Sequence, residues 1–266
     1  MSLKKPNALS LVKPQIDEIP AVIPVSNCER HGQYQHRYQP SLTGNGFIEC
    51  EKCPTCLAEN SPSAERERSD RRKESEQATR KRIEAGVSKR NLGKTLKTYR
   101  AESRGQKYAL SSCMAFAESV KRGDVTGSLF LTGSVGTGKT HLASAIADAL
   151  VDSHRVEIIR LIDLMRRLKE TFSRNCVTTE REVIAHYSNL DVLVIDEIGI
   201  QFDSDTERMF IFDVINGRYE NQLPTILISN LSMDSLKPIL GGRCTDRLRE
   251  DGGIAIAFNW ESERGK

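Results

Sequence analysis

The sequence predicts an α/β protein whose main domain is a three-layer fold, with one parallel sheet between two layers of helices. From about residue 91 to residue 266, runs of Val, Ile and Leu bounded by turn residues alternate with amphipathic segments, which is typical of a parallel sheet covered on both faces. The first of these runs is followed by a glycine-rich loop and then by a helix-forming segment. In addition, four cysteines within residues 28–56 predict a small metal-binding module ahead of this domain.

The composition limits the classes of protein that fit the chain. Its 266 residues suffice for one well-packed domain and a smaller appendage. Lys and Arg number 39 against 36 Asp and Glu, so the net charge is only +3 and any contact with nucleic acid must come from a local patch. No apolar run approaches the roughly 20 residues that span a bilayer, and the N-terminal stretch lacks the apolar core of a signal peptide. We therefore expect a cytoplasmic protein with no membrane partner, in which the cysteine spacing indicates metal binding before disulfides.

Three parts are predicted along the chain: a module at 1–60, a charged helical linker at 61–90 and the α/β domain at 91–266. Residues 28–56 of the module have too few large aliphatic side chains to fold unaided, and residues 1–27 are rich in Pro without any hydrophobic period. The linker is dense in Arg, Lys and Glu, and opposite charges at neighbouring positions stabilise a solvated helix. Two functions fit the linker: a spacer, or a basic arm that follows a phosphate backbone. Its nearly balanced acids favour the spacer.

Each element of the α/β domain is predicted from its own pattern of apolar residues. Short continuous apolar runs predict strands at 128–133, 155–161, 191–199, 224–230 and 253–260. Longer segments with apolar residues at helical spacing predict helices at 141–151, 163–172 and 207–220. Ligands of open α/β sheets bind at the carboxyl ends of the strands, so polar residues that follow these strands are candidate site residues.

A phosphate-binding loop joins the first predicted strand to the first predicted helix. Gly133, four further residues and then Gly138-Lys139-Thr140 complete the pattern in the strand-to-helix context that its mechanism requires. Backbone N–H groups of such a loop surround the phosphates, Lys139 reaches the β and γ phosphates, and the Thr140 hydroxyl binds magnesium. The residues predicted to bind the nucleotide are Gly133, Ser134, Val135, Gly136, Thr137, Gly138, Lys139, Thr140 and His141. The expected cofactors are ATP and Mg²⁺.

Polar side chains at the ends of two other strands predict hydrolysis of this nucleotide. Four apolar residues lead into Asp196-Glu197, where Asp196 is expected to hold magnesium and Glu197 to act as the general base that orients the attacking water. A small-molecule kinase has no use for a water-activating Glu, whereas an ATPase requires one. Asn230 ends the strand at 224–230 and is suited to contact the γ phosphate or the water, although Asn also ends strands for ordinary turn reasons.

Three arginines, Arg243, Arg247 and Arg249, follow in the segment GGRCTDRLRE. A guanidinium supplied across a subunit interface would neutralise the charge that develops during phosphoryl transfer. The alternative is a solvated helix face.

Four soft ligands in the N-terminal module predict a structural zinc site. Cys28 and His31 are three residues apart, as are Cys53 and Cys56, and the intervening stretch has a reasonable length for a zinc finger. A set that uses Cys50 or His36 instead, or reduced thiols in an unfolded arm, are the alternatives. Four protein ligands leave no open position for water, so the folded module would serve to grip protein or DNA.

Six segments resemble the DnaC-like helicase loaders, which are AAA+ ATPases of the initiator clade. They are GTGKTHLASAIADAL, LMRRLKETF, LDVLVIDEIGIQ, TILISN, GGRCTDRLR and FNWES, and they occur in this order from residue 136 to residue 262. The resemblance implies ATP-controlled delivery of a DnaB-type replicative helicase hexamer onto single-stranded DNA at replication initiation, by a protein that assembles with copies of itself on the helicase. It further implies that the N-terminal region holds the helicase.

The resemblance also assigns roles to individual residues. The phosphate-loop lysine of the family falls on Lys139, its magnesium aspartate on Asp196, its sensor asparagine on Asn230 and its arginine finger on Arg247. Its second sensor arginine, a nucleotide contact, falls on Arg264.

A predicted DNA contact also rests on the resemblance. Phe172 matches an aromatic residue that stacks on a base, with Arg166, Arg167 and Lys169 beside it for phosphates. By spacing alone, a place for Phe172 in the core of an amphipathic helix is favoured over a DNA contact.

Two rival functions use the same phosphate loop. An IstB-like DNA-binding ATPase would assist a transposase and prefer duplex DNA. A small-molecule kinase is disfavoured by Asp196-Glu197 and by the zinc module.

Overall fold

The computed structural model describes residues 15–42, 46–124, 127–199 and 205–263. The chain divides into two compact units, one up to Ser75 and the other from Glu76 onward. The predicted charged helix is present as α2, Pro62–Glu84, and it runs through this division. None of its residues is buried.

The unit before Glu76 is built from small antiparallel sheets. Strands β1 (Gln15–Ile16), β5 (Phe47–Cys50) and β4 (Arg37–Pro40) form one sheet in that order, and β2 (Val25–Cys28) pairs with β3 (Gly32–Gln35) in a second sheet. The short helix α1 (Pro54–Glu59) follows. Among the described residues of this unit only Ser41 and Cys53 are buried, so it has very little hydrophobic core.

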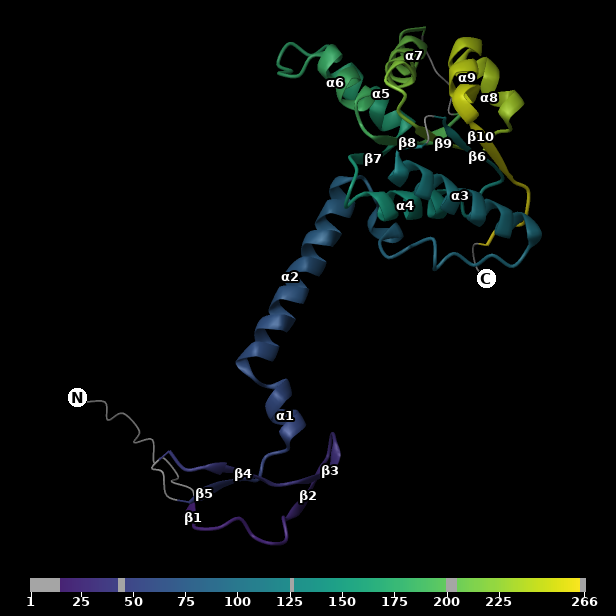
Figure 1. The fold of residues 1–266 in the computed structure, drawn as a ribbon. Helices are drawn as coiled ribbons and strands as arrows, with labels where there is room; N and C mark the ends of the chain where they lie inside the picture. The colour runs from purple at the N-terminus through teal and green to yellow at the C-terminus, as the bar shows by residue number, and fades with distance from the viewer. Residues whose placement is uncertain (1–14, 43–45, 125–126, 200–204, 264–266) are drawn as a thin grey trace, which may run out of the picture. The chain divides into compact units, whose positions relative to one another are not determined.

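The second unit contains the predicted three layers, and its sheet is entirely parallel (Figure 1). The strand order is β10-β6-β9-β8-β7. The strands are β6 (Leu129–Gly133), β7 (Val156–Arg160), β8 (Val192–Ile198), β9 (Thr225–Ser229) and β10 (Ile254–Phe258). All five predicted strands are thus present, with ends that shift by two residues at most.

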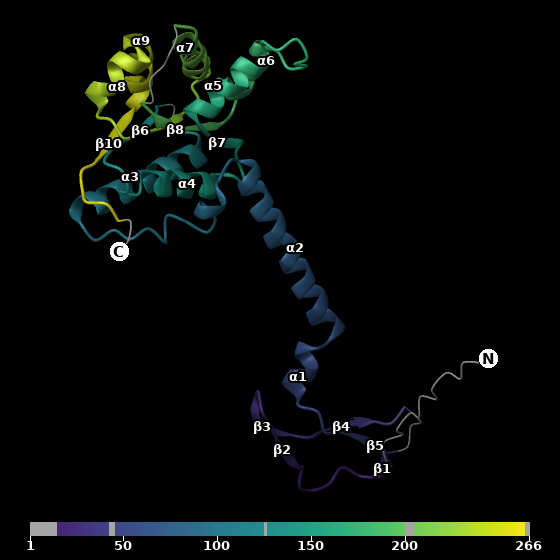
Figure 2. The ribbon, with the colours of Figure 1, turned by 180° about the vertical axis from the view of Figure 1, so that it is seen from behind.

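Helices cover both faces of this sheet (Figures 1 and 2). On one face lie α3 (Arg104–Arg122) and α4 (Lys139–Leu150). On the other face lie α5 (Leu161–Glu170), α6 (Glu180–Ser188), α7 (Asp205–Glu220), α8 (Met233–Leu240) and α9 (Gly242–Arg249). Short 3₁₀ turns, η1 (Lys89–Asn91) and η2 (Glu250–Gly252), lie before α3 and after α9.

Alternation along the strands produces two separate cores. Leu129 and Leu131 of β6 pack with α3 and α4, whereas Phe130 between them packs with the helices of the opposite face. Successive side chains of a strand point to opposite faces, so a strand covered on both sides needs an apolar residue at every position. The continuous apolar runs of the sequence reflect this requirement.

The start of α3 follows from local sequence. The Ser103 side chain accepts a hydrogen bond from the backbone N–H of Gln106, and the Gln106 side chain accepts one from the backbone N–H of Ser103, which forms a capping box. Gly123 ends the helix in a left-handed conformation.

No helix of the described residues is both long and apolar enough to cross a membrane.

Candidate nucleotide and metal sites

The predicted phosphate loop connects β6 to α4 at the carboxyl edge of the sheet. Gly133, Gly136 and Gly138 have φ angles of 122°, 83° and 95°, a region that L-residues with side chains rarely adopt. Space is also restricted, because a Cβ on Gly133 would lie within 2.4 Å of the Phe258 carbonyl oxygen. On Gly138 it would lie 2.9 Å from the Tyr99 ring. Backbone conformation and close packing therefore both require glycine at these two positions.

A cavity of about 550 Å³ lies beside this loop. The predicted site residues that line it are Val135, Gly136, Thr137, Gly138, Lys139, Thr140, His141, Asp196, Glu197 and Asn230. Gly133 and Ser134 are not among the lining residues, and Arg264 lies outside the described residues. Six further residues line the cavity although they were not predicted site residues, and they are Arg90, Asn91, Lys94, Ile228, Ser229 and Glu263. The first three belong to the segment around η1, where no motif indicates a site.

Lys139 is held against its own loop. Its side chain is buried, and Nζ donates hydrogen bonds to the carbonyl oxygens of Gly133 at 2.7 Å and Ser134 at 2.6 Å. The Thr137 hydroxyl also donates to the Ser134 carbonyl, at 2.8 Å. These contacts place a fixed positive charge at the wall of the cavity, where it favours an anionic ligand.

Two oxygen ligands suited to magnesium meet across the cavity floor. The Thr140 hydroxyl donates to Asp196 Oδ2 at 3.1 Å. Neighbouring oxygens of an octahedral Mg²⁺ site, with bonds of 2.0–2.1 Å, lie about 2.9 Å apart, so this pair fits two adjacent positions. Burial raises the pKa of Asp196, although the backbone N–H of Glu197 and the Thr140 hydroxyl oppose the shift by hydrogen bonding to the carboxylate. A divalent cation would stabilise the ionised form that burial disfavours.

Glu197 occupies a strained position beside Asp196. Its φ is 60°, in the left-handed region, and its side chain is exposed. The pairing of β8 with β9 shifts register between Ile195 and Ile198, and this irregularity contains both acids. Bulges reorient side chains near active sites, and a non-glycine residue in the left-handed region costs about 1–3 kcal/mol. Asn230 follows the end of the neighbouring strand β9 and lines the same cavity.

The arginines of α9 do not line the nucleotide cavity of their own chain. The Arg247 guanidinium lies between two rings, 5.0 Å from the centroid of Phe212 and 5.3 Å from that of Tyr219. Its Nη1 is buried without a hydrogen-bond partner. Arg243, one turn earlier, is exposed, as is Arg249. A role for Arg243, Arg247 or Arg249 in hydrolysis would therefore require a second subunit.

The segment predicted to contact DNA has an exposed aromatic ring at its end. Phe172 follows α5 and is 61% exposed, so the alternative that it belongs to the core is wrong. The nearby cations form ion pairs within the protein, with N–O distances of 3.1 Å for Arg166–Asp163, 2.9 Å for Arg167–Glu157 and 2.7 Å for Lys169–Glu207. The Phe172 ring is exposed although it also packs against Phe210, with the ring centroids 6.1 Å apart.

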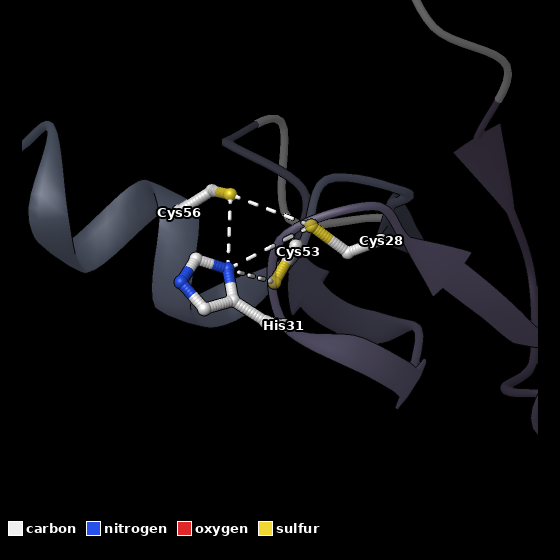
Figure 3. Close-up of side chains that lie close together, drawn as sticks. All are labelled: Cys28, His31, Cys53 and Cys56. Atoms are coloured by element: carbon white, nitrogen blue, oxygen red, sulfur yellow. Dashed lines mark hydrogen bonds between the residues drawn. The ribbon is translucent and has the colours of Figure 1, made fainter.

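The four predicted zinc ligands lie together at the junction of β2, β3 and α1 (Figure 3). His31 Nδ1 is 3.7 Å from Cys28 Sγ, 3.6 Å from Cys53 Sγ and 3.3 Å from Cys56 Sγ, and the Cys28 and Cys56 sulfurs are 3.7 Å apart. A tetrahedral zinc ion with ordinary Zn–S and Zn–N bonds separates its ligands by about 3.6–3.8 Å. The donor types and spacings therefore fit zinc.

The alternative ligand sets are not assembled. Cys50 is absent from the described cluster, and His36 bonds instead to Ser26 at 2.6 Å and Glu49 at 2.8 Å. The outer nitrogen of His31 bonds to Glu59 at 3.2 Å, a contact that fixes ring orientation at metal sites.

The cysteine environments also favour thiolates at two positions. Hydrogen bonds from the backbone N–H groups of Arg30 and His31 lower the pKa of Cys28. A hydrogen bond from the backbone N–H group of Cys56 lowers the pKa of Cys53. Burial raises the pKa of Cys56 to about 11, a shift that metal binding would oppose because a zinc-bound thiol is deprotonated.

Comparison with known proteins places the chain in a family. Residues 67–246 match the family described as IstB-like ATP binding protein. The replicative helicase loader DnaC of Escherichia coli K12 is 36% identical over 183 residues, which are 68% of this chain and 74% of that protein. The corresponding loader of Buchnera aphidicola subsp. Baizongia pistaciae is 34% identical over the same shares.

Solved structures agree with this placement. A crystal structure of the DnaC helicase loader has a TM-score of 0.55 and 26% identity, and the match covers 64% of this chain and 99% of that one. A DnaI structure has a TM-score of 0.54 and 26% identity, over 64% of this chain and 93% of that one. The replication initiator DnaA bound to AMPPCP and single-stranded DNA shares the fold, with a TM-score of 0.54 over 63% of this chain and 50% of that one, at 24% identity. The chain therefore belongs to the IstB-like ATP-binding family and is a homologue of the DnaC replicative helicase loaders.

Proposed function

We propose that this protein is an ATP-dependent helicase loader, which binds a DnaB-type replicative helicase hexamer and delivers it to single-stranded DNA at replication initiation. The observation that carries the proposal is 36% identity with a replicative helicase loader over 68% of the chain. The geometry of the phosphate loop supports it, because the loop already has the backbone conformation that binds phosphate.

ATP is the nucleotide that we place in the cavity. In the bound state, Lys139 exchanges the carbonyl oxygens of Gly133 and Ser134 for the β and γ phosphates. Thr140 and Asp196 hold Mg²⁺, which neutralises charge on the phosphate oxygens when bound. Glu197 accepts a proton from the attacking water while the water oxygen forms a bond to the γ phosphorus. At the same time the bond between the γ phosphorus and the bridging oxygen breaks, and ADP leaves with that oxygen. Asn230 contacts the γ phosphate or this water.

An arginine from a neighbouring subunit completes the site in this proposal. The resemblance assigns the role to Arg247, which the two aromatic rings hold within its own subunit. Arg243 on the same helix is exposed. Self-assembly on the helicase would bring α9 of one subunit to the cavity of the next, and ATP would then stabilise the assembly as a switch rather than a power supply.

The exposed Phe172 ring is the proposed contact with single-stranded DNA. Stacking on an aromatic ring stabilises a base whatever its identity, which suits a loader that acts on many sequences. Arg166, Arg167 and Lys169 are proposed to follow the phosphates, and each would exchange a carboxylate partner for a phosphate oxygen on binding.

The N-terminal part is the proposed helicase grip. We divide the chain into a zinc-binding module at 1–60, a linker at 61–90 and the ATPase domain at 91–266. Zinc held by Cys28, His31, Cys53 and Cys56 would replace the hydrophobic core that this module lacks. No ligand position remains open, so the role of the ion is structural.

A helicase-delivery assay tests the proposal. A DnaB-type helicase is added to a single-stranded circle that is coated with single-strand-binding protein and carries an annealed oligonucleotide, and release of the oligonucleotide is measured. The wild-type protein should promote release in the presence of ATP, and Lys139→Ala should reduce the effect at least about tenfold because the phosphate contacts are lost. Lys107→Ala on the exposed face of α3 is the matched control and should act like the wild type.

Either of two results would overturn the proposal. Lys139→Ala could support normal delivery, or the wild-type protein could ignore the helicase while duplex DNA stimulates its ATPase activity. The second result would favour an IstB-like ATPase that assists a transposase, which the matching family description also accommodates.

A further inference from the structure

The segment after β10 contacts the phosphate loop through two of the backbone carbonyl groups of the loop. The indole Nε1–H of Trp260 donates a hydrogen bond to the carbonyl oxygen of Thr137 at 3.0 Å. The backbone N–H of Glu263 donates to the carbonyl oxygen of Gly136 at 2.9 Å. Two successive peptide groups of the loop are therefore bound by one short stretch of chain more than 120 residues away.

These two contacts determine where the loop directs its donors. In a trans peptide the C=O and the following N–H point in opposite directions. With the carbonyl groups of Gly136 and Thr137 held by these two donors, the N–H groups of Thr137 and Gly138 point away from Glu263 and Trp260, and both residues line the cavity. Successive inward N–H groups form the concave anion site on which phosphate binding depends.

The indole ring of Trp260 packs against Phe258 and Gly105. Its ring centroid lies 4.7 Å from that of Phe258, the last residue of β10. Gly105 of α3 leaves room for the ring, because a Cβ at this position would be 3.2 Å from Trp260 Cε3. The side chain of Glu263 accepts a hydrogen bond from Gln106 Nε2 at 3.1 Å, and Gln106 is itself the residue of the α3 capping box. The core of the domain therefore positions the segment.

A second aromatic residue reinforces the same carbonyl group. The Tyr99 hydroxyl donates to the Thr137 oxygen at 3.4 Å, and its ring covers Gly138. Burial raises the pKa of Tyr99 to about 12, so the hydroxyl keeps its proton at neutral pH. The Thr137 carbonyl group thus accepts hydrogen bonds from Tyr99, which precedes the phosphate loop in the sequence, and from Trp260, which follows β10.

We propose that Trp260 is a positioning residue for nucleotide binding, which acts through the Thr137 carbonyl to keep the Thr137 and Gly138 N–H groups directed at the phosphates. The proposal rests on ATP binding in this cavity. It gives a physical reason for the FNWES segment, whose Trp is otherwise remote from the chemistry. Tyr99 supports the same peptide group as a weaker second donor.

The nucleotide affinity of a Trp260→Phe variant tests the proposal, because phenylalanine keeps an aromatic ring beside Phe258 and Gly105 but lacks the indole N–H. Dissociation constants for ATP, ADP and adenosine are measured by calorimetry. Loss of one neutral hydrogen bond should weaken ATP and ADP about 3- to 10-fold, and adenosine affinity should not change because it has no phosphate. Tyr99→Phe should have a smaller effect, and the double variant should lose more than the product of the two single factors, since each donor partly compensates for the other. Tyr108→Phe, at an exposed position on α3, is the matched control.

A measurement on the wild-type protein keeps the test independent of folding. The chain has one tryptophan, so a ¹⁵N-labelled sample gives a single indole N–H resonance. The proposal expects this proton to exchange slowly with solvent and its resonance to shift when ADP is added.

Unchanged ATP affinity in Trp260→Phe, an equal loss of adenosine affinity, or an indole resonance that ADP does not move would overturn the role of Trp260 while leaving ATP binding intact. Failure of the wild-type protein to bind ATP would instead remove the nucleotide step of the proposed function.

Discussion

Glu197 at the cavity combines a carboxylate group with an unfavourable backbone conformation. Glu197 has a left-handed φ that a side chain disfavours, although its carboxylate is the group proposed to orient water. Glycine would adopt the same conformation without the steric cost. A site that keeps Glu197 in this conformation therefore sacrifices stability for the position of a carboxylate.

Replacement of Glu197 separates strain from chemistry. Glu197→Gly and Glu197→Gln should both abolish ATP hydrolysis, because each lacks the carboxylate. The glycine variant should nevertheless be more stable than the glutamine variant by about 1 kcal/mol, since relief of the left-handed strain exceeds the entropy that glycine adds to the unfolded chain. Urea unfolding of both variants measures the difference. A glycine variant that is less stable than the glutamine variant would show that the position is not strained.

The site residues differ in how far the sequence reveals them. Lys139, Thr140 and Asp196 belong to short motifs in which the chemistry and the spacing occur together, so they are predictable. Trp260 and Glu263 act on the loop through contacts with residues more than 120 positions away, and no local pattern indicates such a contact. Likewise, the ring pair around Arg247 becomes visible only when α7 and α9 pack together.

At the scale of elements, periodicity predicts the buried parts of the fold best. The five strands are continuous apolar runs because both of their faces are covered, and each was found within two residues of its predicted ends. Helices α3, α6, α8 and α9 were not among the predicted elements. Two of them begin with a capping box, at Ser103 and Thr179, so a local signal was available at their starts.

Some connections between elements have no signal in the sequence. Arg218 of α7 is fully buried and donates to the carbonyl oxygens of Tyr187, Leu190 and Pro224 at 2.8, 2.7 and 2.6 Å. It thereby links α7 to the segments before β8 and β9. An arginine near the end of a helix ordinarily indicates a solvated position, so this link depends on tertiary structure that composition cannot predict.

At this same scale, we expect the N-terminal module to depend on a zinc ion. A purified chain should contain one zinc ion, and Cys56→Ser should lose most of it, because the three remaining ligands cannot complete a tetrahedral site. Cys50→Ser is the matched control and should keep the zinc, since Cys50 lies outside the described cluster. Metal content is measured by atomic absorption on the full chain.

Zinc removal should affect the two units differently. The residues before Glu76 have almost no buried core, so a strong chelator should increase their amide hydrogen exchange, whereas ATP binding by the second unit should persist. Equal zinc loss in Cys50→Ser and Cys56→Ser, or unchanged exchange after chelation, would contradict the assigned ligands.

At the scale of the whole molecule, the chain consists of a unit that carries the nucleotide cavity and a unit that we propose a zinc ion stabilises, and the charged helix α2 includes the division between them in the sequence. The second unit has the large core, two layers of helices and the nucleotide cavity. Among its described residues the first has almost no core, and four of its side chains could bind a metal ion. This division of properties suits a protein in which one part responds to ATP and the other holds a partner.

The measurement that tests the central claim most directly is the mass of the complex with a DnaB-type helicase hexamer. The purified chain and the helicase are mixed with and without ATP and analysed by size-exclusion chromatography with light scattering. The account predicts a defined complex that is heavier than the hexamer alone and that Cys56→Ser weakens through the loss of the zinc module. No complex under either condition, with ATP hydrolysis stimulated by duplex DNA instead, would contradict the helicase-loading function.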